Sequence, residues 1–432
     1  MGDHGIREKI EEYIQAHLRV NRFSGTVLVS SGGEILVNKG YGLADAGKQI
    51  PCRDVTRYWL ESISKVFDSM AVFRLKEEGR LDLQDPVANH VPGWPSPWNA
   101  VTISHLLTHG SGIVLTPDKV YGYFGQDEPD PAVLALMEAR LEFLPGRGFS
   151  YCNAGYVVLE IIVARVSGQS HESFLRDAII EPMKLSATTV GLGHGRYEST
   201  ACGYGMVGGQ IAERVPSDVC TDTEGPWGLV STTHDLYLLE RALDVHGFFS
   251  RESLDLMWTR VNGSYGHGWL TGEVGGRRMV GHDGGDRGFA TSYRFFPDSG
   301  TCVAVLSNYD TAPTARMACD LAAIVFGEGY VLPKERVAIQ VGPSVLAELA
   351  GTYKLPSGYV KVLTIRLEGS KLFASVGEGE SAIAFELFAE SPASFFSPVT
   401  NQSWEFVRDA DGKIKGFTVE DGVDEVLCEK LS

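Results

Sequence analysis

The spacing of apolar residues along the chain distinguishes helical segments from strands. Residues 7–19 repeat apolar side chains on a helical period, which predicts an amphipathic helix near the start. Residues 25–30 and 34–41 are rich in β-branched and apolar residues, and they flank a Ser-Gly-Gly sequence at 31–33. That combination is typical of two strands joined in a hairpin.

The middle of the chain predicts two buried helices and then a return to strands. One helix runs from Ser62 to about Glu78, before Gly79, and the other covers Gly155–Ser167. The later elements are four strands and a helix, at Tyr265–Thr271, Arg278–Gly281, Thr291–Phe296, Thr301–Ser307 and Ala312–Phe326. Early and late strands with helices between them predict an α/β (α+β) domain, in which one antiparallel sheet is flanked by helices and joined by a helical lobe.

The pattern changes after residue 333. Residues 334–345 read as a linker, and residues 346–432 form short alternating runs punctuated by Gly, Asp and Ser. This is the pattern of a small all-β barrel or sandwich. We therefore expect one domain at 1–333 and a C-terminal barrel. The barrel either controls access to a site or assembly, or it is a stability module away from any site.

Composition narrows the possible partners and the location. The net charge of -17 over 432 residues disfavours nucleic acid and an anionic membrane surface. No stretch approaches ~20 consecutive apolar residues, and the first twenty residues lack the apolar core of a signal peptide. The seven cysteines are scattered without a C-x-x-C pair, so they read as reduced. These features predict a cytoplasmic protein with no membrane partner.

The chemistry concentrates in Ser62-Ile63-Ser64-Lys65. A serine hydroxyl needs a nearby base to act as a nucleophile, and a helix beginning at Ser62 places Lys65 one turn away on the same face. Tyr151 offers a second route for the proton, and Asn153 can bind both an ammonium and a substrate amide. This combination predicts an acyl-transferring enzyme.

These segments resemble the serine β-lactamase and penicillin-binding-protein superfamily, in its class C-like branch of esterases, D-aminopeptidases, amidases and peptide-cyclising enzymes. The resemblance runs from about Phe23 to Asn308 and includes "ESISKVFDSM", "FSYCNAGY" and "GHDGGDRGF". The C-terminal segment resembles the lipocalin-like appendage of some members. The resemblance implies a β-lactamase-like fold. It also implies that the protein is a serine hydrolase that uses no metal or cofactor.

The resemblance also implies roles for individual residues. Ser62 is the acylated nucleophile, Lys65 its activator, and Tyr151 and Asn153 the second motif. His282 and Gly284 match the third motif, with His282 expected to be catalytic and Gly284 to bind substrate. Gly285 supplies an oxyanion N–H beside that of Ser62.

Three residues depart from the family pattern. Asp283 replaces a small hydroxyl residue, where it either repels a substrate carboxylate or points away and orients His282. Arg287 replaces a frequent proline, and it neutralises a nearby acid or meets an acidic substrate group. Glu61 stands where glycine or alanine is usual.

One histidine pair has a spacing that also occurs in metal sites. His105 and His109 have the i, i+4 spacing of metal ligands, but no third ligand is evident, so a structural turn is preferred.

The expected function is a carboxylesterase-like serine hydrolase acting on a small-molecule or peptide substrate. The alternatives are a D-aminopeptidase or amidase, an acyl-transferring or peptide-cyclising enzyme, and a non-catalytic binding protein that kept the fold. A homo-oligomer is possible, and the pocket is expected in residues 113–140 and 191–226.

Overall fold

The described part of the chain separates into two compact units. One comprises Met1–Gly205 with Ile211–Val331, and the other comprises Met206–Gln210 with Leu332–Ser432. The computed structural model describes residues 3–20, 23–114, 141–190, 199–207, 210–213, 228–245, 247–286, 288–333, 336–355, 362–376, 383–397, 403–421 and 424–431.

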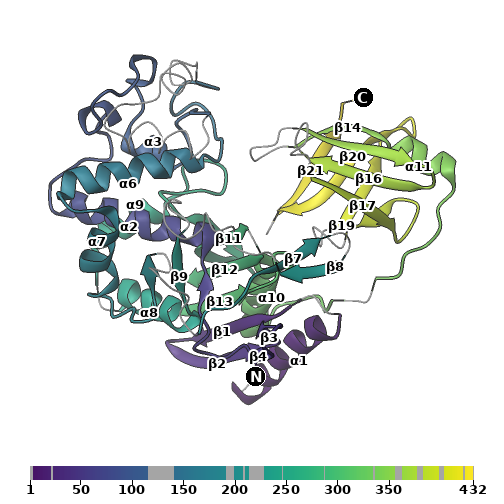
Figure 1. Cartoon of the computed structure of the whole chain (residues 1–432), viewed down its shortest axis with the longest axis horizontal. Coiled ribbons are helices and arrows are strands. Elements are labelled where there is room, and N and C mark those ends of the chain that lie inside the picture. The colour runs from purple at the N-terminus through teal and green to yellow at the C-terminus, as the bar shows by residue number, and fades with distance from the viewer. Residues whose placement is uncertain are drawn as a thin grey trace. The chain divides into compact units, whose positions relative to one another are not determined.

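An antiparallel sheet organises the first unit, as the sequence predicts. Among the described residues it has six strands in the order β10-β11-β12-β13-β1-β2, so that the first strands of the chain pair with the last of this unit (Figure 1). The strands are β10 Leu270–Val274, β11 Arg277–Asp286, β12 Phe289–Phe296, β13 Thr301–Ser307, β1 Gly25–Ser31 and β2 Glu34–Tyr41. The predicted start of β10 at Tyr265 is wrong, because Gly268 takes a left-handed φ of 85° and turns the chain before the strand begins.

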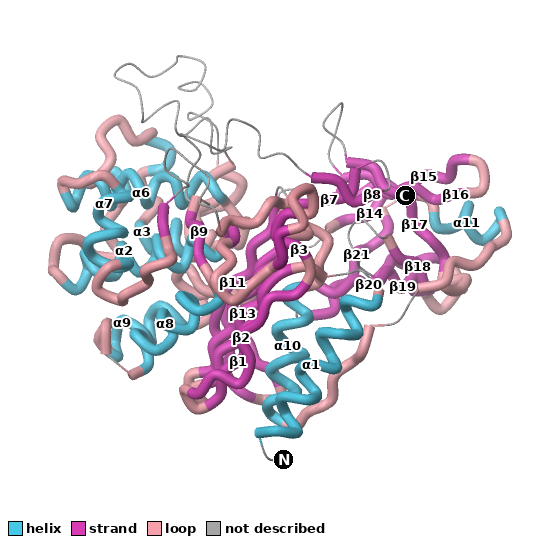
Figure 2. Tube along the Cα trace, turned by 60° about the horizontal axis from the view of Figure 1, so that its bottom comes forward, coloured by secondary structure: helices cyan, strands magenta, loops and turns pink. Residues whose placement is uncertain are grey.

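The two faces of this sheet bury different sets of side chains. Helices α1 (Asp3–Arg19) and α10 (Thr314–Phe326) lie side by side on one face (Figure 2). Side chains alternate along each strand, so Val303 and Val305 join this core while Cys302 and Ala304 join the core on the opposite face. The same alternation decides which side chains of β11 can reach the active site.

The opposite face meets the helical lobe. Its main helices are α2 Ser64–Glu77, α3 Ile103–Leu107, α6 Asn153–Ser167, α7 His171–Leu175, α8 Thr233–Asp244 and α9 Arg251–Trp258. Helix α6 ends at Gly168, whose φ of 74° provides the left-handed C-cap that glycine adopts without steric cost. Helix α2 is buried almost all round, so the Ser62 segment is packed within the lobe.

The second unit is a closed antiparallel barrel. Its eight strands within the described residues follow chain order: β14 Gly351–Lys354, β15 Val362–Glu368, β16 Lys371–Val376, β17 Ile383–Ala389, β18 Ser394–Phe396, β19 Ser403–Arg408, β20 Ile414–Asp421 and β21 Asp424–Lys430. Inward residues such as Leu372, Trp404 and Phe417 form their own core. Helix α11 (Pro343–Leu349) begins inside the segment predicted as a linker.

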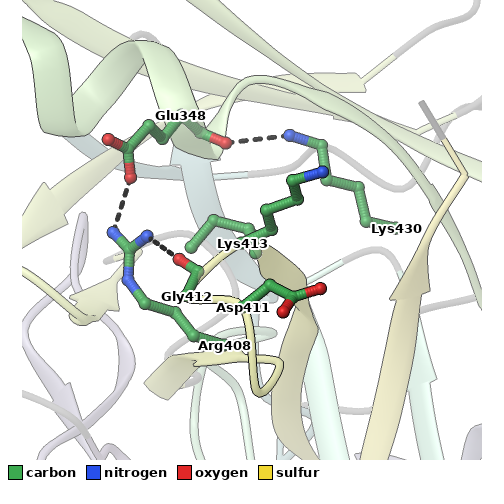
Figure 3. Close-up of a pocket in the computed structure, with 7 residues that line it drawn as sticks. Glu348, Arg408, Asp411, Gly412, Lys413 and Lys430 are labelled. Carbon is green, nitrogen blue, oxygen red and sulfur yellow. Dashed lines mark hydrogen bonds and ion pairs between the residues drawn. The ribbon is translucent and has the colours of Figure 1, made fainter.

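A pocket of about 420 Å³ opens on this barrel unit (Figure 3). Arg408 pairs with the Glu348 carboxylate at 2.7 Å and donates to the carbonyl of Gly412, and Lys430 donates to the carbonyl of Glu348 at 2.8 Å. None of the described residues that line it carries a hydroxyl or thiol. It is therefore no candidate for acyl transfer.

The structure also bears on the cysteines and on membrane-spanning helices. The six cysteines in the described ranges have free thiols and are buried. No helix in the described part of the chain combines the length and apolar character needed to cross a membrane.

Candidate active site

Ser62 and Lys65 meet at the start of α2. Ser62 lies in a short 3-10 turn, η1 (Glu61–Ile63), and Lys65 lies in the first turn of α2. The Nζ atom of Lys65 is 3.0 Å from Oγ of Ser62. Lys65 is fully buried whereas Ser62 is partly exposed, so the hydroxyl is accessible while its partner is shielded from water.

The residue before Ser62 has an unusual backbone. Glu61 takes a left-handed φ of 52°, which costs free energy for any residue except glycine. The turn is held on both sides: the N–H of Leu60 donates to Leu229, and the hydroxyl of Thr291 donates to the carbonyl of Leu60. A strained turn anchored to the sheet fixes the direction in which Ser62 projects.

Aromatic rings surround the ammonium group of Lys65. The ring centroids of Tyr151 and Tyr156 lie 5.0 and 5.4 Å from Nζ, within the range of a cation–π interaction. Tyr156 is fixed by its hydroxyl, which donates to the carbonyl of Leu107. Asn153 is the first residue of α6, and α6 packs on α2, so the second motif approaches the Ser62 helix.

His109 holds the second motif in place. Its Nδ1 accepts a hydrogen bond from the N–H of Cys152 at 2.9 Å, and its ring centroid lies 4.1 Å from that of Tyr151. Burial, and then the charge of Lys65, lower the pKa of His109 well below its usual value, so the ring is neutral. His105 instead accepts from the N–H of Thr102 at the start of α3. The two imidazoles thus have separate partners.

The hydrogen bonds of His282 define its tautomer. Nδ1 lies 2.6 Å from the carbonyl oxygen of Asp283, which can only accept, so Nδ1 carries the proton. Nε2 then accepts from the hydroxyl of Tyr265, also at 2.6 Å. Both ring nitrogens therefore have protein partners, and the ring is buried beside Tyr265. This arrangement suits a residue that positions its neighbours.

Lowering the pH from 7 to 5 is expected to weaken the fold, because His282 binds a proton on unfolding. Burial, and then the charge of Lys65, lower its folded pKa to about 3, against about 6.5 in the unfolded chain. The contribution of neutral His282 to the free energy of unfolding is complete above about pH 6.5. It decreases between about pH 6.5 and pH 3, by up to about 1.4 kcal/mol per pH unit. Urea unfolding at several pH values measures this slope.

Two variants isolate the effect of His282. His282→Gln should flatten the dependence of unfolding free energy on pH, although His109 and His267, whose pKa values burial also lowers, keep part of it. Replacing the exposed His234 by glutamine is the matched control and should leave the slope unchanged. An unaltered slope in His282→Gln would contradict the assignment.

Asp283 points to the other face of the sheet. Successive side chains of a strand alternate, so Asp283 lies on the face covered by α1 and α10 while His282 faces the helical lobe. Its Oδ2 is 2.7 Å from Nη2 of Arg294, a fully buried residue of β12. The expectation that this carboxylate repels a substrate carboxylate therefore loses its basis. Of the two alternatives, the geometry favours the one in which the side chain points away.

Gly284 permits β11 to approach the turn that carries Ser62. A Cβ atom at this position would lie 2.3 Å from the carbonyl oxygen of Leu60 and 2.9 Å from Cβ of Glu61. Gly285 follows at an exposed position of β11. Arg287 lies outside the described residues, as does most of the expected pocket at 113–140 and 191–226.

Gly284→Ala is expected to lower activity while the domain stays folded. The added methyl group must push the turn that carries Ser62 away from β11, and a displacement near 1 Å can cost about 10²-fold in rate. The measurement is kcat/KM with circular dichroism as the check on folding. Gly155→Ala on α6 is the matched control, because its Cβ would meet nothing closer than 3.6 Å. Full activity in Gly284→Ala would contradict this geometry.

Several residues of this arrangement have no signal in the sequence. Tyr265 reads as part of a strand, Tyr156 as a core residue of α6, and His109 as part of a turn. Arg294 is the single charged residue of the fully buried strand β12, and that contrast could have indicated a charged partner. Which residue is the partner of Arg294 depends on the register of β11 and β12, in which Gly281 lies opposite Arg294.

A serine held by a buried lysine, at the junction of an antiparallel sheet and a helical lobe, is the arrangement of a serine hydrolase of the β-lactamase fold. The chain belongs to the family described as Beta-lactamase, which matches residues 7–325.

Relatives extend the likeness to the whole chain. Penicillin-binding protein 4* of Bacillus subtilis (strain 168) is 29% identical over 441 residues, covering 94% of each protein. The octameric penicillin-binding protein homologue from Pyrococcus abyssi has a TM-score of 0.66 at 23% identity, over 97% of this chain and 98% of that one. SurE has a TM-score of 0.64 at 20% identity over 100% of both chains. The two structural likenesses show the fold, with the C-terminal barrel included.

Proposed function

We propose that the chain is a carboxylesterase-like hydrolase that forms an acyl intermediate on Ser62. The observation that carries this is the 3.0 Å contact between Lys65 Nζ and Ser62 Oγ, with the lysine fully buried and the serine partly exposed. A nucleophile next to a base that is shielded from water fits covalent catalysis.

The reaction has two steps. Ser62 attacks the substrate carbonyl, and its proton passes to Lys65 or to Tyr151. Backbone N–H groups of Ser62 and Gly285 hold the resulting oxyanion, and Asn153 binds a polar group of the substrate. That proton then reaches the leaving group through Tyr151. Water or another acceptor attacks the acyl carbonyl, its proton returns to Ser62 Oγ through the same groups, and the bond between Ser62 and the acyl group breaks.

The neutral ring of His282 organises this site through Tyr265. The ring centroid of Tyr265 lies 6.3 Å from that of Tyr151 and 4.7 Å from that of His109. The orientation of Tyr265 therefore affects how these two rings pack. His282 fixes the Tyr265 hydroxyl, and we assign both residues to positioning. Lys65 then meets a preorganised set of rings whichever group takes the first proton.

Ester substrates are favoured over substrates with a free amine. An amine-binding role for Asp283 would have favoured a D-aminopeptidase, but that carboxylate is engaged with Arg294. Arg287 has no described placement and supports neither class. Amide hydrolysis and acyl transfer remain second candidates, because the same acyl-Ser62 intermediate can transfer its acyl group to an amine.

A substrate panel tests the proposal. p-Nitrophenyl acetate and butyrate, D- and L-aminoacyl p-nitroanilides and nitrocefin are incubated with the protein, and intact-mass spectrometry follows acylation. Ester turnover without anilide cleavage supports the esterase. Cleavage of D-anilides alone identifies an aminopeptidase. Failure of a fluorophosphonate probe to label Ser62, together with no turnover, would identify a binding protein that kept the fold.

A further inference from the structure

Three helices of the lobe, one of which is α2 itself, bring a carboxylate pair and an imidazole together. Asp68 lies on α2, Glu160 on α6 and His171 at the first position of α7, and these helices pack against one another (Figure 1). One potential ligand atom from each residue lies within 4.8 Å of the other two. The positions are widely separated in sequence, so no spacing motif predicts this cluster.

The cluster is buried, and one polar atom each of Asp68 and His171 lacks a hydrogen-bond partner among the described residues. The Asp68 side chain is 2% exposed, and those of His171 and Glu160 are 15% and 12% exposed. Nε2 of His171 is 3.0 Å from Oδ1 of Asp68, yet that nitrogen makes no hydrogen bond of acceptable geometry. Among the described residues, Oδ2 of Asp68 also lacks a hydrogen-bond partner. A buried carboxylate oxygen without a donor is costly, and a bound ion or an ordered water would satisfy it.

We propose that Asp68, Glu160 and His171 bind one divalent transition-metal ion of the Zn²⁺ or Mn²⁺ type. Zn²⁺ and Mn²⁺ accept a mixed set of imidazole nitrogen and carboxylate oxygens. Ca²⁺ and Mg²⁺ bind oxygen ligands alone, so they fit this cluster less well. Three protein ligands leave room for one or more waters on the ion. The two carboxylates and one imidazole also supply the excess negative charge that a divalent ion neutralises.

The contacts within the cluster approach the spacing of ligands on one ion. Ligand atoms on a shared ion at about 2.0–2.2 Å lie about 3–3.5 Å apart. The Asp68–His171 contact of 3.0 Å already meets this, and Nδ1 of His171 is 3.9 Å from Oε1 of Glu160. These two contacts use different nitrogens of one ring, so His171 must turn until a single nitrogen faces both carboxylates.

The ion would join the elements that carry the two halves of the active site. Asp68 lies one helical turn beyond Lys65, whose charge acts on its carboxylate, and Glu160 belongs to the helix that begins at Asn153. Cross-linking α2 to α6 and α7 therefore stabilises the lobe. The binding itself does not depend on the proposed esterase function.

Mn²⁺ is the first probe, since manganese binds thiolates poorly and the chain has buried cysteines. The full-length protein, stripped with a chelator and dialysed against micromolar MnCl2, should retain one Mn²⁺ per chain by elemental analysis. The bound ion should show an altered electron paramagnetic resonance spectrum, and thermal unfolding should shift upward by a few degrees. ZnCl2 is then tested by the same dialysis.

Matched variants locate the ion. Asp68→Asn and His171→Gln should each lower retained Mn²⁺ at least about tenfold. His90→Gln is the control, because His90 pairs with Asp85 at the same 3.0 Å but without a third ligand, and it should retain the full stoichiometry. If either test variant fails to fold by circular dichroism, Glu160→Gln replaces it.

Either of two results would overturn the proposal: a wild-type protein that retains neither Mn²⁺ nor Zn²⁺, or stoichiometric retention by folded Asp68→Asn. In the first case the cluster is an ion triad, with a protonated His171 between two carboxylates. Its stability would then decrease as the pH rises, because the charges of Glu160 and Asp68 raise the pKa of His171 against the opposing effect of burial.

Discussion

Ser62→Ala is expected to abolish ester turnover, by about 10³-fold or more in kcat, while the unfolding transition stays unchanged. No acyl intermediate can form without the hydroxyl, and Lys65 then has no nucleophile to activate. Intact-mass spectrometry with p-nitrophenyl butyrate should show an adduct on the wild-type protein and none on the variant.

The neighbouring Ser64 provides a matched control. It is fully buried, and its hydroxyl makes no hydrogen bond within the described structure, so Ser64→Ala removes a similar group one helical position from Lys65. Activity should survive that change. Wild-type rates in purified Ser62→Ala would rule out Ser62 as the nucleophile, whereas equal losses in both variants would point to a general disturbance of the turn.

Sequence reasoning succeeds where a site is encoded locally. A serine three positions before a lysine meets it in space because one helical turn separates them, and the structure places the two atoms 3.0 Å apart. Strand positions were also largely predictable, because β1, β2, β12 and β13 have strong apolar patterns. Their pairing across the two ends of the chain follows from the fold class.

The rest depends on packing that the sequence does not reveal. The direction of Asp283 is set by the pleat of β11, and its partner Arg294 comes from the next strand. Tyr265 reaches His282 only because the chain turns at Gly268 instead of entering a strand. Asp68 and His171 are about one hundred residues apart, and only the packing of α2 on α7 joins them.

Asp283→Asn is expected to lower the free energy of unfolding by about 3–5 kcal/mol. Arg294 is fully buried and its guanidinium loses its carboxylate partner, which leaves an uncompensated charge inside the protein. Chemical denaturation of the purified variant measures the loss. Asp255→Asn is the control, since Asp255 pairs with Arg251 on the surface, where such a pair contributes within about 1 kcal/mol.

A double variant shows whether Asp283 stabilises the fold only through its ion pair with Arg294 or also by itself. Asp283→Asn combined with Arg294→Met removes both charges and keeps the volume, so most of the lost stability should return. Because Asp283 faces α10 and not the helical lobe, neither variant should increase acylation by nitrocefin, whose carboxylate the charge would otherwise repel. No recovery in the double variant would contradict a stabilising role limited to the pair. Faster acylation by nitrocefin in Asp283→Asn would instead place this carboxylate on the substrate side of the sheet.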